Sequence, residues 1–148
     1  MRVGFVGLGV MGLPMAGHLL AAGHDVAVWA RRPESAAPIV AAGAMACGSP
    51  AELAARSEVV ISIVTASADV EQLAFGPGGL IEGFAPGSIH VDMSTIAPAT
   101  ARRLAARYAG RSIAWLDAPV SGGGQGAIDA TLAIMAGGAL FVLVLLLA

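Results

Sequence analysis

The chain contains 148 residues, of which 57% are hydrophobic and 12% are charged. The length suits one domain of ordinary size, and a hydrophobic share above the roughly 45–50% of average soluble domains excludes a disordered chain. A net charge of −2 with only eight basic residues excludes a basic surface for nucleic acid.

Short apolar runs alternate with helix-like segments along the chain. In order, we expect a strand at 2–6, a helix at 11–22, a strand at 25–30, a helix at 33–42, a brief strand at 44–46, a short helix after Ser49, a strand at 59–64, a helix at 67–75, a strand at 88–93, a helix at 98–109 and strands at 113–118 and 132–136. Ser49-Pro50-Ala51-Glu52 fits a capping box with proline at the first helical position. Most strands are apolar throughout, which is typical of a parallel sheet covered by helices on both faces.

Three glycines, Gly7, Gly9 and Gly12, stand between the first strand and the first helix in the spacing Gly-x-Gly-x-x-Gly. Gly7 allows a tight turn, Gly9 lets a diphosphate approach the backbone, and Gly12 allows close packing of the helix. The helix start then offers free N–H groups to phosphates. The motif predicts dinucleotide binding on a Rossmann-type, doubly wound and mainly parallel α/β sheet. An ordinary turn between strand and helix is the alternative.

The end of the second strand reads Ala30-Arg31-Arg32. Proteins that bind NAD usually carry an acidic residue there for the ribose hydroxyls, whereas an arginine accommodates the 2′-phosphate of NADP. The planar guanidinium matches phosphate oxygens. We therefore expect NADP in preference to NAD. The alternative is that both arginines are a solvated helix entrance.

The remaining features of the chain concern compartment and metal binding. Cys47 is the one cysteine, so an internal disulfide is impossible and a reducing, cytoplasmic compartment is expected. The histidines, His18, His24 and His90, are too scattered to predict a metal site.

The carboxyl-terminal third contains a glycine-rich loop and a long uncharged segment. Ser121-Gly122-Gly123-Gly124 follows a buried strand and is a candidate anion-binding loop, with a plain flexible loop as the alternative. Residues 131–148 carry no charge and approach the roughly 20 apolar residues that span a bilayer as a helix. Two glycines at 137–138 divide this segment, so a buried strand that ends in a turn is favoured over a membrane helix.

Four segments carry a further pattern: GLGVMGLPMAGHL at 7–19, VWARRPE at 28–34, VDMSTIAP at 91–98 and LDAPVSGGGQGAIDATLAIMAGG at 116–138. Together they resemble the β-hydroxyacid dehydrogenases, a family that includes 3-hydroxyisobutyrate dehydrogenase, tartronate semialdehyde reductase and the related imine reductases. The last two segments are long and specific. His18 and Ala30 depart from the family, whose members usually have Asn at both positions.

The resemblance implies an oxidoreductase that transfers hydride between a nicotinamide cofactor and a small 3-hydroxyacid or semialdehyde. It implies a diphosphate cradle formed by Gly7, Leu8, Gly9, Val10, Met11 and Gly12. It implies 2′-phosphate contacts from Arg31 and Arg32, a cofactor path along Val64 and Thr65, and a nicotinamide end near Ser94 and Thr95. It also implies that the carboxylate of a small-molecule substrate is held by Ser121, Gly122 and Gly123.

In this family the proton donor is a lysine in a Gly-x-x-x-Lys-x-x-x-Asn pattern, on the helix that opens an all-helical second domain. This chain contains no lysine, because all eight basic residues are arginines. We therefore expect residues 1–138 to be an NADP-binding domain, with the helical domain absent and no catalytic residue of its own. Residues 139–148 are expected to be a divergent apolar tail produced by truncation or a frameshift.

On this interpretation the chain alone is inactive, and an oligomer is expected only for the full-length family form. Two alternatives remain open: a stand-alone NADPH-binding module, and an imine-reductase-like relative.

Overall fold

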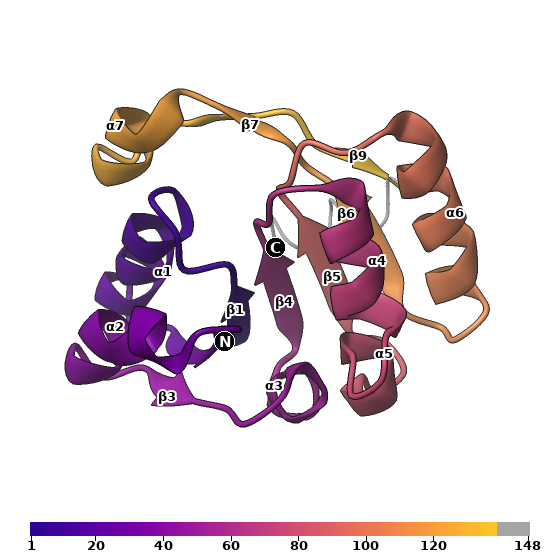
Figure 1. The fold of residues 1–148 in the computed structure, drawn as a ribbon, viewed down its shortest axis with the longest axis horizontal. Coiled ribbons are helices and arrows are strands. Elements are labelled where there is room, and N and C mark those ends of the chain that lie inside the picture. The colour runs from indigo at the N-terminus through magenta and orange to yellow at the C-terminus, as the bar shows by residue number, and fades with distance from the viewer. Residues whose placement is uncertain (139–148) are drawn as a thin grey trace.

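The computed structural model describes residues 1–138, and a seven-stranded sheet forms its centre (Figure 1). The strands are β1 (Arg2–Val6), β2 (Asp25–Trp29), β3 (Met45–Ala46), β4 (Val59–Ser62), β5 (Ile89–Asp92), β6 (Ala114–Asp117) and β9 (Gly137–Gly138). Their order is β3-β2-β1-β4-β5-β6-β9, and every pair is parallel except β6 with β9. This is the strand order of a dinucleotide-binding sheet, so the predicted Rossmann-type fold is confirmed.

Helices cover both faces of this sheet. They are α1 (Gly12–Ala21), α2 (Ala37–Ala41), α3 (Pro50–Arg56), α4 (Ser67–Phe75), α5 (Leu80–Gly83), α6 (Pro98–Ala109) and α7 (Gly123–Ile128), with a 3₁₀ helix, η1, at Pro33–Ala36. In Figure 1, α1 and α2 lie on one side of the sheet, and α4, α5 and α6 lie on the other.

The hydrophobic core forms one layer against each face of the sheet. Phe5 and Val28 pack with Ala16 on the side of α1, and Val60 packs with Leu53 on the opposite side. Successive residues of a strand point to opposite faces, so a sheet covered on both sides needs apolar residues at nearly every strand position. This explains why the strands appear in the sequence as unbroken apolar runs.

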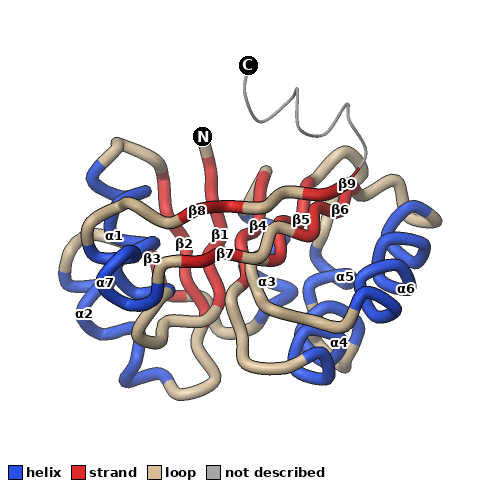
Figure 2. The backbone as a smooth tube through the Cα atoms, turned by 90° about the horizontal axis from the view of Figure 1, so that it is seen from above, coloured by secondary structure: helices blue, strands red, loops and turns tan. Residues whose placement is uncertain are grey.

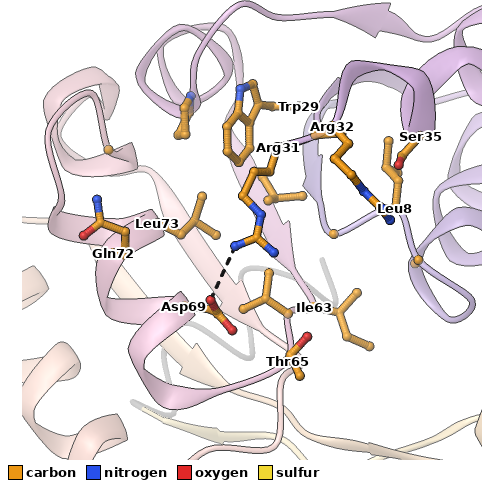
Figure 3. A pocket seen from close by; sticks show the side chains of 18 of the residues that line it. Leu8, Trp29, Arg31, Arg32, Ser35, Ile63, Thr65, Asp69, Gln72 and Leu73 are labelled. Atoms are coloured by element: carbon orange, nitrogen blue, oxygen red, sulfur yellow. Dashed lines mark ion pairs between the residues drawn. The ribbon is translucent and has the colours of Figure 1, made fainter.

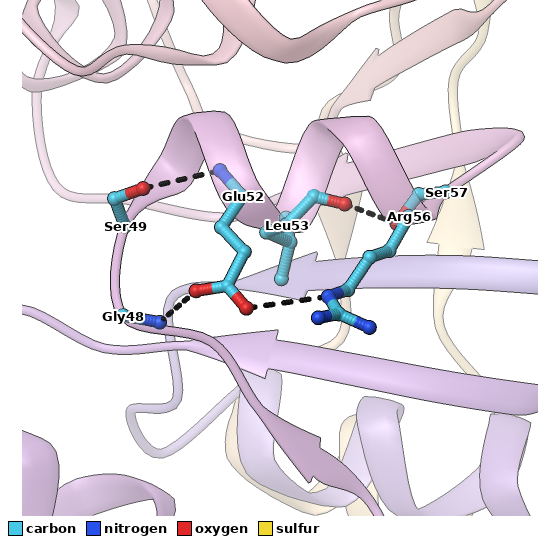
Figure 4. A network of polar contacts seen from close by, with 6 residues as sticks. All are labelled: Gly48, Ser49, Glu52, Leu53, Arg56 and Ser57. Atoms are coloured by element: carbon cyan, nitrogen blue, oxygen red, sulfur yellow. Dashed lines mark hydrogen bonds and ion pairs between the residues drawn. The ribbon is translucent and has the colours of Figure 1, made fainter.

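The amino terminus of α3 is capped by side chains (Figure 4). Ser49 Oγ accepts a hydrogen bond from the Glu52 N–H at 3.1 Å, as the capping box predicts. The Glu52 carboxylate does not return to the Ser49 N–H but accepts from the Gly48 N–H at 2.8 Å and from Arg56 Nε at 3.2 Å. The second hydrogen bond of the capping box is thus made with the amide of Gly48, one residue before Ser49. The extended backbone of Ser49 brings that amide within reach of the Glu52 carboxylate.

The carboxyl-terminal part differs most from prediction. The expected glycine-rich loop at 121–124 begins at the end of a short strand, β7 (Val120–Ser121), and runs into the start of α7. The expected buried strand at 132–136 is wrong: β8 (Ala133–Ile134) pairs antiparallel with β7 outside the main sheet, and Ile134 and Met135 are 54% and 56% exposed. Figure 2 shows this two-stranded ribbon crossing over the carboxyl edge of the main sheet toward α7 and α1.

Two smaller departures concern helices. The predicted helix at 33–42 divides into η1 and α2, and α5 was not predicted because four residues are too few to show a helical period. Within residues 1–138, no helix combines the length and apolar character needed to cross a bilayer. The predicted divergent tail at 139–148 lies outside the described residues.

Candidate functional site

A cleft of about 650 Å³ lies at the carboxyl ends of β1, β2 and β4. The strand order of the sheet reverses at this point, which is where open α/β sheets bind ligands. The predicted cofactor residues that line the cleft are Gly7, Leu8, Gly9, Met11, Gly12, Arg31, Arg32, Val64 and Thr65. The other three, Val10, Ser94 and Thr95, do not line it.

The glycine loop has two glycines that the chain itself requires and one that it does not. Gly7 has a φ of +97°, and a Cβ there would lie 1.9 Å from the carbonyl oxygen of Ile63. A Cβ on Gly12 would lie 1.8 Å from the carbonyl oxygen of Gly7, so Gly12 serves the closure of the loop as well as helix packing. A Cβ on Gly9 would meet no protein atom within 4 Å. The space beside Gly9 is therefore free for a ligand to approach the backbone.

The start of α1 adds a hydrogen-bond donor to this space. No side chain caps the helix at Met11. In the first turn the Leu13 N–H donates to the Gly9 carbonyl at 3.0 Å and Pro14 has no N–H, which leaves the Gly12 N–H without a partner among the described residues. Amides in this position, together with the positive end of the helix dipole, bind phosphate groups. Val10 is 81% exposed and does not line the cleft.

Two arginines and a serine stand at the far wall, after β2. Arg31 and Arg32 line the cleft together with Ser35 of η1 (Figure 3). The Arg31 side chain is 86% exposed, and its Nη1 lies 3.8 Å from Asp69 Oδ1 of α4. Exposed ion pairs of this kind contribute about 0–1 kcal/mol, so Arg31 is free to exchange Asp69 for another anion.

The remaining walls are mainly apolar and were not predicted from the sequence. Trp29, Ile63 and Leu73 line the cleft, with Gln72 beside Leu73 (Figure 3). An apolar slot with a few polar groups at its ends is typical of small-molecule sites. A usable signal existed for Trp29, which ends β2 at the same edge of the sheet where the glycine loop begins.

Ser94 and Thr95 follow β5 but occupy different environments. Thr95 is exposed, whereas Ser94 is buried behind the cleft. Ser94 Oγ accepts a hydrogen bond from the Val64 N–H at 2.8 Å and donates one to Asp92 Oδ1 at 2.7 Å. Ser94 thus reaches the cleft only through the backbone of Val64.

The glycine-rich segment at 121–123 is exposed and opens α7. Gly122 and Gly123 have φ values of +139° and +63°, backbone conformations that side chains rarely adopt. The segment does not line the cleft. Its expected role in carboxylate binding stays a prediction.

The position of α7 is fixed by contacts with the first helix. His18 Nε2 lies 3.0 Å from the carbonyl oxygens of both Ala127 and Ile128, and a Cβ on Gly124 would lie 2.9 Å from Val10 Cγ1. The two glycine-rich loops, more than a hundred residues apart in the chain, are therefore neighbours. No cluster of three or more metal-ligating side chains occurs within residues 1–138.

Comparison with known proteins agrees with this geometry. The family described as the NAD binding domain of 6-phosphogluconate dehydrogenase matches residues 2–142. The 3-hydroxyisobutyrate dehydrogenase of Pseudomonas aeruginosa is 43% identical over 136 residues, which are 92% of this chain and 46% of that protein.

Solved structures give the same result. The 3-hydroxyisobutyrate dehydrogenase of Mycobacterium tuberculosis, solved with L-serine, superposes with a TM-score of 0.90 at 35% identity over 96% of this chain and 48% of that one. Psf3, solved with NADP⁺ and 2-OPP, gives a TM-score of 0.93 at 34% identity over 97% of this chain and 51% of that one. This chain thus spans about half the length of the relatives it matches. The predicted resemblance is confirmed: the chain is similar to 3-hydroxyisobutyrate dehydrogenases, and it belongs to the family described as the NAD binding domain of 6-phosphogluconate dehydrogenase.

Proposed function

We propose that the cleft binds NADP(H), with the diphosphate held by the backbone of Gly7–Gly12 and the start of α1. The observation that carries the proposal is the unobstructed space at Gly9, beside a helix start that no side chain caps. A ligand with phosphate groups supplies an acceptor for the Gly12 N–H at this helix start. The solved relative Psf3 is described with NADP⁺.

The preference for NADP over NAD rests on the wall after β2. Arg31, Arg32 and Ser35 line it, and no carboxylate follows β2 at the position that NAD-binding proteins use for the ribose hydroxyls. Two guanidinium groups and a hydroxyl supply donors for a 2′-phosphate.

For the whole protein we propose hydride transfer between the cofactor and a small 3-hydroxyacid or semialdehyde. The bound cofactor supplies a nicotinamide ring that accepts or donates the hydride, and the protein contributes binding and orientation. Ser121 would donate its hydroxyl to the substrate carboxylate, with the N–H groups of Gly122 and Gly123. These 148 residues contain no lysine, so the proton donor implied by the resemblance would come from outside them, and we expect them to bind cofactor without turnover.

The experiment is a fluorescence titration of the full chain with NADPH and with NADH, repeated on Gly9→Ala. The added methyl group meets no protein atom but occupies the space that the diphosphate needs. We expect Gly9→Ala to lose NADPH binding and to keep the unfolding midpoint of the wild type. Gly17→Ala in α1, whose Cβ would make only an ordinary contact at 4.0 Å with Ile39, is the matched control. A wild-type chain that binds neither dinucleotide would refute the proposal.

A further inference from the structure

Polar side chains end three neighbouring strands of the main sheet. Ser62, Asp92 and Asp117 are the last residues of β4, β5 and β6, and the strand register places them side by side. Ser62 and Asp92 are fully buried. Ligand-binding edges of α/β sheets lie at these carboxyl ends, and buried polar groups require hydrogen-bond partners.

A continuous chain of hydrogen bonds runs through two members of this row, Ser62 and Asp92. The Tyr108 hydroxyl lies 2.7 Å from His90 Nδ1, and His90 Nε2 lies 2.8 Å from Ser62 Oγ. Ser62 Oγ donates to Asp92 Oδ1 at 2.7 Å. From the other side, Ser94 Oγ donates to the same Oδ1 at 2.7 Å.

The proton positions follow from counting donors. A serine hydroxyl has one hydrogen, and Ser62 gives it to Asp92, so His90 must donate to Ser62 from Nε2. Burial lowers the pKa of His90 to about 3, which keeps the ring neutral. Its Nδ1 is then an acceptor, and the Tyr108 hydroxyl donates to it. Every hydrogen bond therefore points toward Asp92 Oδ1.

The chain of bonds ends on the backbone of the cleft. Beyond β4 the Ile63 N–H still donates to the Val6 carbonyl of β1, at 3.0 Å. The next amide, that of Val64, faces the side of β5, where the strand has already ended at Asp92. Ser94 Oγ takes the place of the missing strand carbonyl and accepts this amide at 2.8 Å. Val64 and Thr65 then continue along the wall of the cleft.

We propose that Asp92 and Ser94 are positioning residues: Asp92 orients the Ser94 hydroxyl, which fixes the Val64–Thr65 backbone on the nicotinamide side of the cleft. The assignment of that side rests on the proposed function. With the diphosphate at the glycine loop and the 2′-phosphate at Arg31 beyond β2, the other half of the dinucleotide extends across β4. Neither Asp92 nor Ser94 lines the cleft, so both act through Val64.

The test compares two ligands that share the adenosine half. NADPH carries the nicotinamide, and 2′-phospho-ADP-ribose lacks it. Loss of one hydrogen bond in Ser94→Ala should weaken NADPH about tenfold and leave 2′-phospho-ADP-ribose within about twofold. Ser57→Ala is the matched control, because the buried Ser57 hydroxyl donates to the Leu53 carbonyl at 2.7 Å away from the cleft (Figure 4). This control should leave both affinities unchanged.

A conservative variant separates positioning from general stabilisation. Asp92→Asn keeps an Oδ1 acceptor and should bind NADPH within about threefold of the wild type, whereas Asp92→Ala should lose about tenfold. Equal losses for the two ligands in Ser94→Ala, or equal losses in Ser94→Ala and Ser57→Ala, would overturn the inference.

Amide hydrogen exchange tests the inference without any ligand. Ser94→Ala should remove the protection of the Val64 amide while the Ile63 amide, bonded to Val6, stays protected. Unchanged protection at Val64 would also overturn the inference. A wild-type chain that binds no dinucleotide would refute the proposed function instead, and the exchange result would still decide whether Ser94 holds the Val64 backbone.

Discussion

Arg31 and Asp69 face each other across the cleft, with Arg31 Nη1 3.8 Å from Asp69 Oδ1 (Figure 3). The arginine comes from the loop after β2 and the carboxylate from the first turn of α4. A 2′-phosphate that binds Arg31 must therefore displace Asp69 or accept its negative charge as a neighbour. The pair makes the cleft less favourable for NADP than the arginines alone would make it.

Asp69→Asn should consequently tighten NADPH binding. The substitution removes the competing charge and keeps the size of the side chain. The energy of an exposed ion pair of this type corresponds to a gain of about two- to fivefold in NADPH affinity. NADH, which lacks the 2′-phosphate, should change less. Titration of both cofactors at low salt measures the difference.

Glu71→Gln on the same helix is the control, because Glu71 pairs with Arg103 instead. Equal gains in NADPH and NADH affinity for Asp69→Asn would contradict this interpretation.

Arg31→Ala should have the opposite effect. Loss of a hydrogen bond to a charged group should weaken NADPH about 10- to 100-fold, while NADH changes by less than about threefold. The side chain is 86% exposed, so the unfolding midpoint should stay constant. Arg2→Ala, which removes an exposed arginine paired with Glu58, is the control. If the two cofactors weakened equally, Arg31 would not read the 2′-phosphate.

Strands β1 to β6 of the main sheet and the glycine loop were predictable because local chemistry determines them. Strand β9 was not, because Gly137 and Gly138 were expected to form a turn. Proline opens α6 at Pro98, and the predicted limits of α4 and α6 agree with the structure. The spacing of Gly7, Gly9 and Gly12 specifies a tight turn. A side chain at Gly7 or at Gly12 would collide with a backbone carbonyl oxygen.

The remaining parts depend on contacts between distant segments. Half of the residues of α7 are glycine, and the helix lies beside α1 through a contact with His18, which a local pattern cannot reveal. β8 is as apolar as a buried strand yet lies exposed, because it pairs with β7 outside the main sheet. The pairing of Arg31 with Asp69 likewise joins the loop after β2 to the first turn of α4. An acidic residue in that turn was foreseeable from the sequence, but its partner was not.

Gly7→Ala should destabilise the fold, in contrast to Gly9→Ala. A left-handed backbone costs a side-chain-bearing residue about 1–3 kcal/mol, and the added Cβ would also lie 1.9 Å from the Ile63 carbonyl oxygen. We therefore expect a loss of about 3 kcal/mol or more in the free energy of unfolding, measured by urea denaturation. Equal stability of the Gly7 and Gly9 variants would show that the loop does not close as described.

Acid should destabilise the chain through His90. Burial lowers the pKa of His90 from 6.5 to about 3, so the folded protein keeps a neutral ring at pH values where the unfolded chain binds a proton. The contribution of the neutral His90 ring to the stability of the fold is complete above pH 6.5. It is lost as the pH falls from 6.5 toward 3, because the unfolded chain takes up the proton first. Burial raises the pKa of Asp92, and this shift acts in the opposite sense. The stability that the protonated Asp92 carboxyl contributes is present in acid and is lost as the pH rises.

His90→Gln separates the two effects. Glutamine can keep a donor toward Ser62 but binds no proton, and Asp92 is present in both proteins. The wild type should be the more stable at pH 7, and its advantage should shrink by up to about 1.4 kcal/mol per pH unit between pH 6 and 4. Urea denaturation at several pH values measures this gap. Tyr108→Phe removes a hydroxyl from the same network without removing a group that titrates in this range, so its difference from the wild type should stay constant. A constant gap for His90→Gln would mean that the buried ring is protonated in the folded protein, and the direction assigned to the hydrogen bonds would then be wrong.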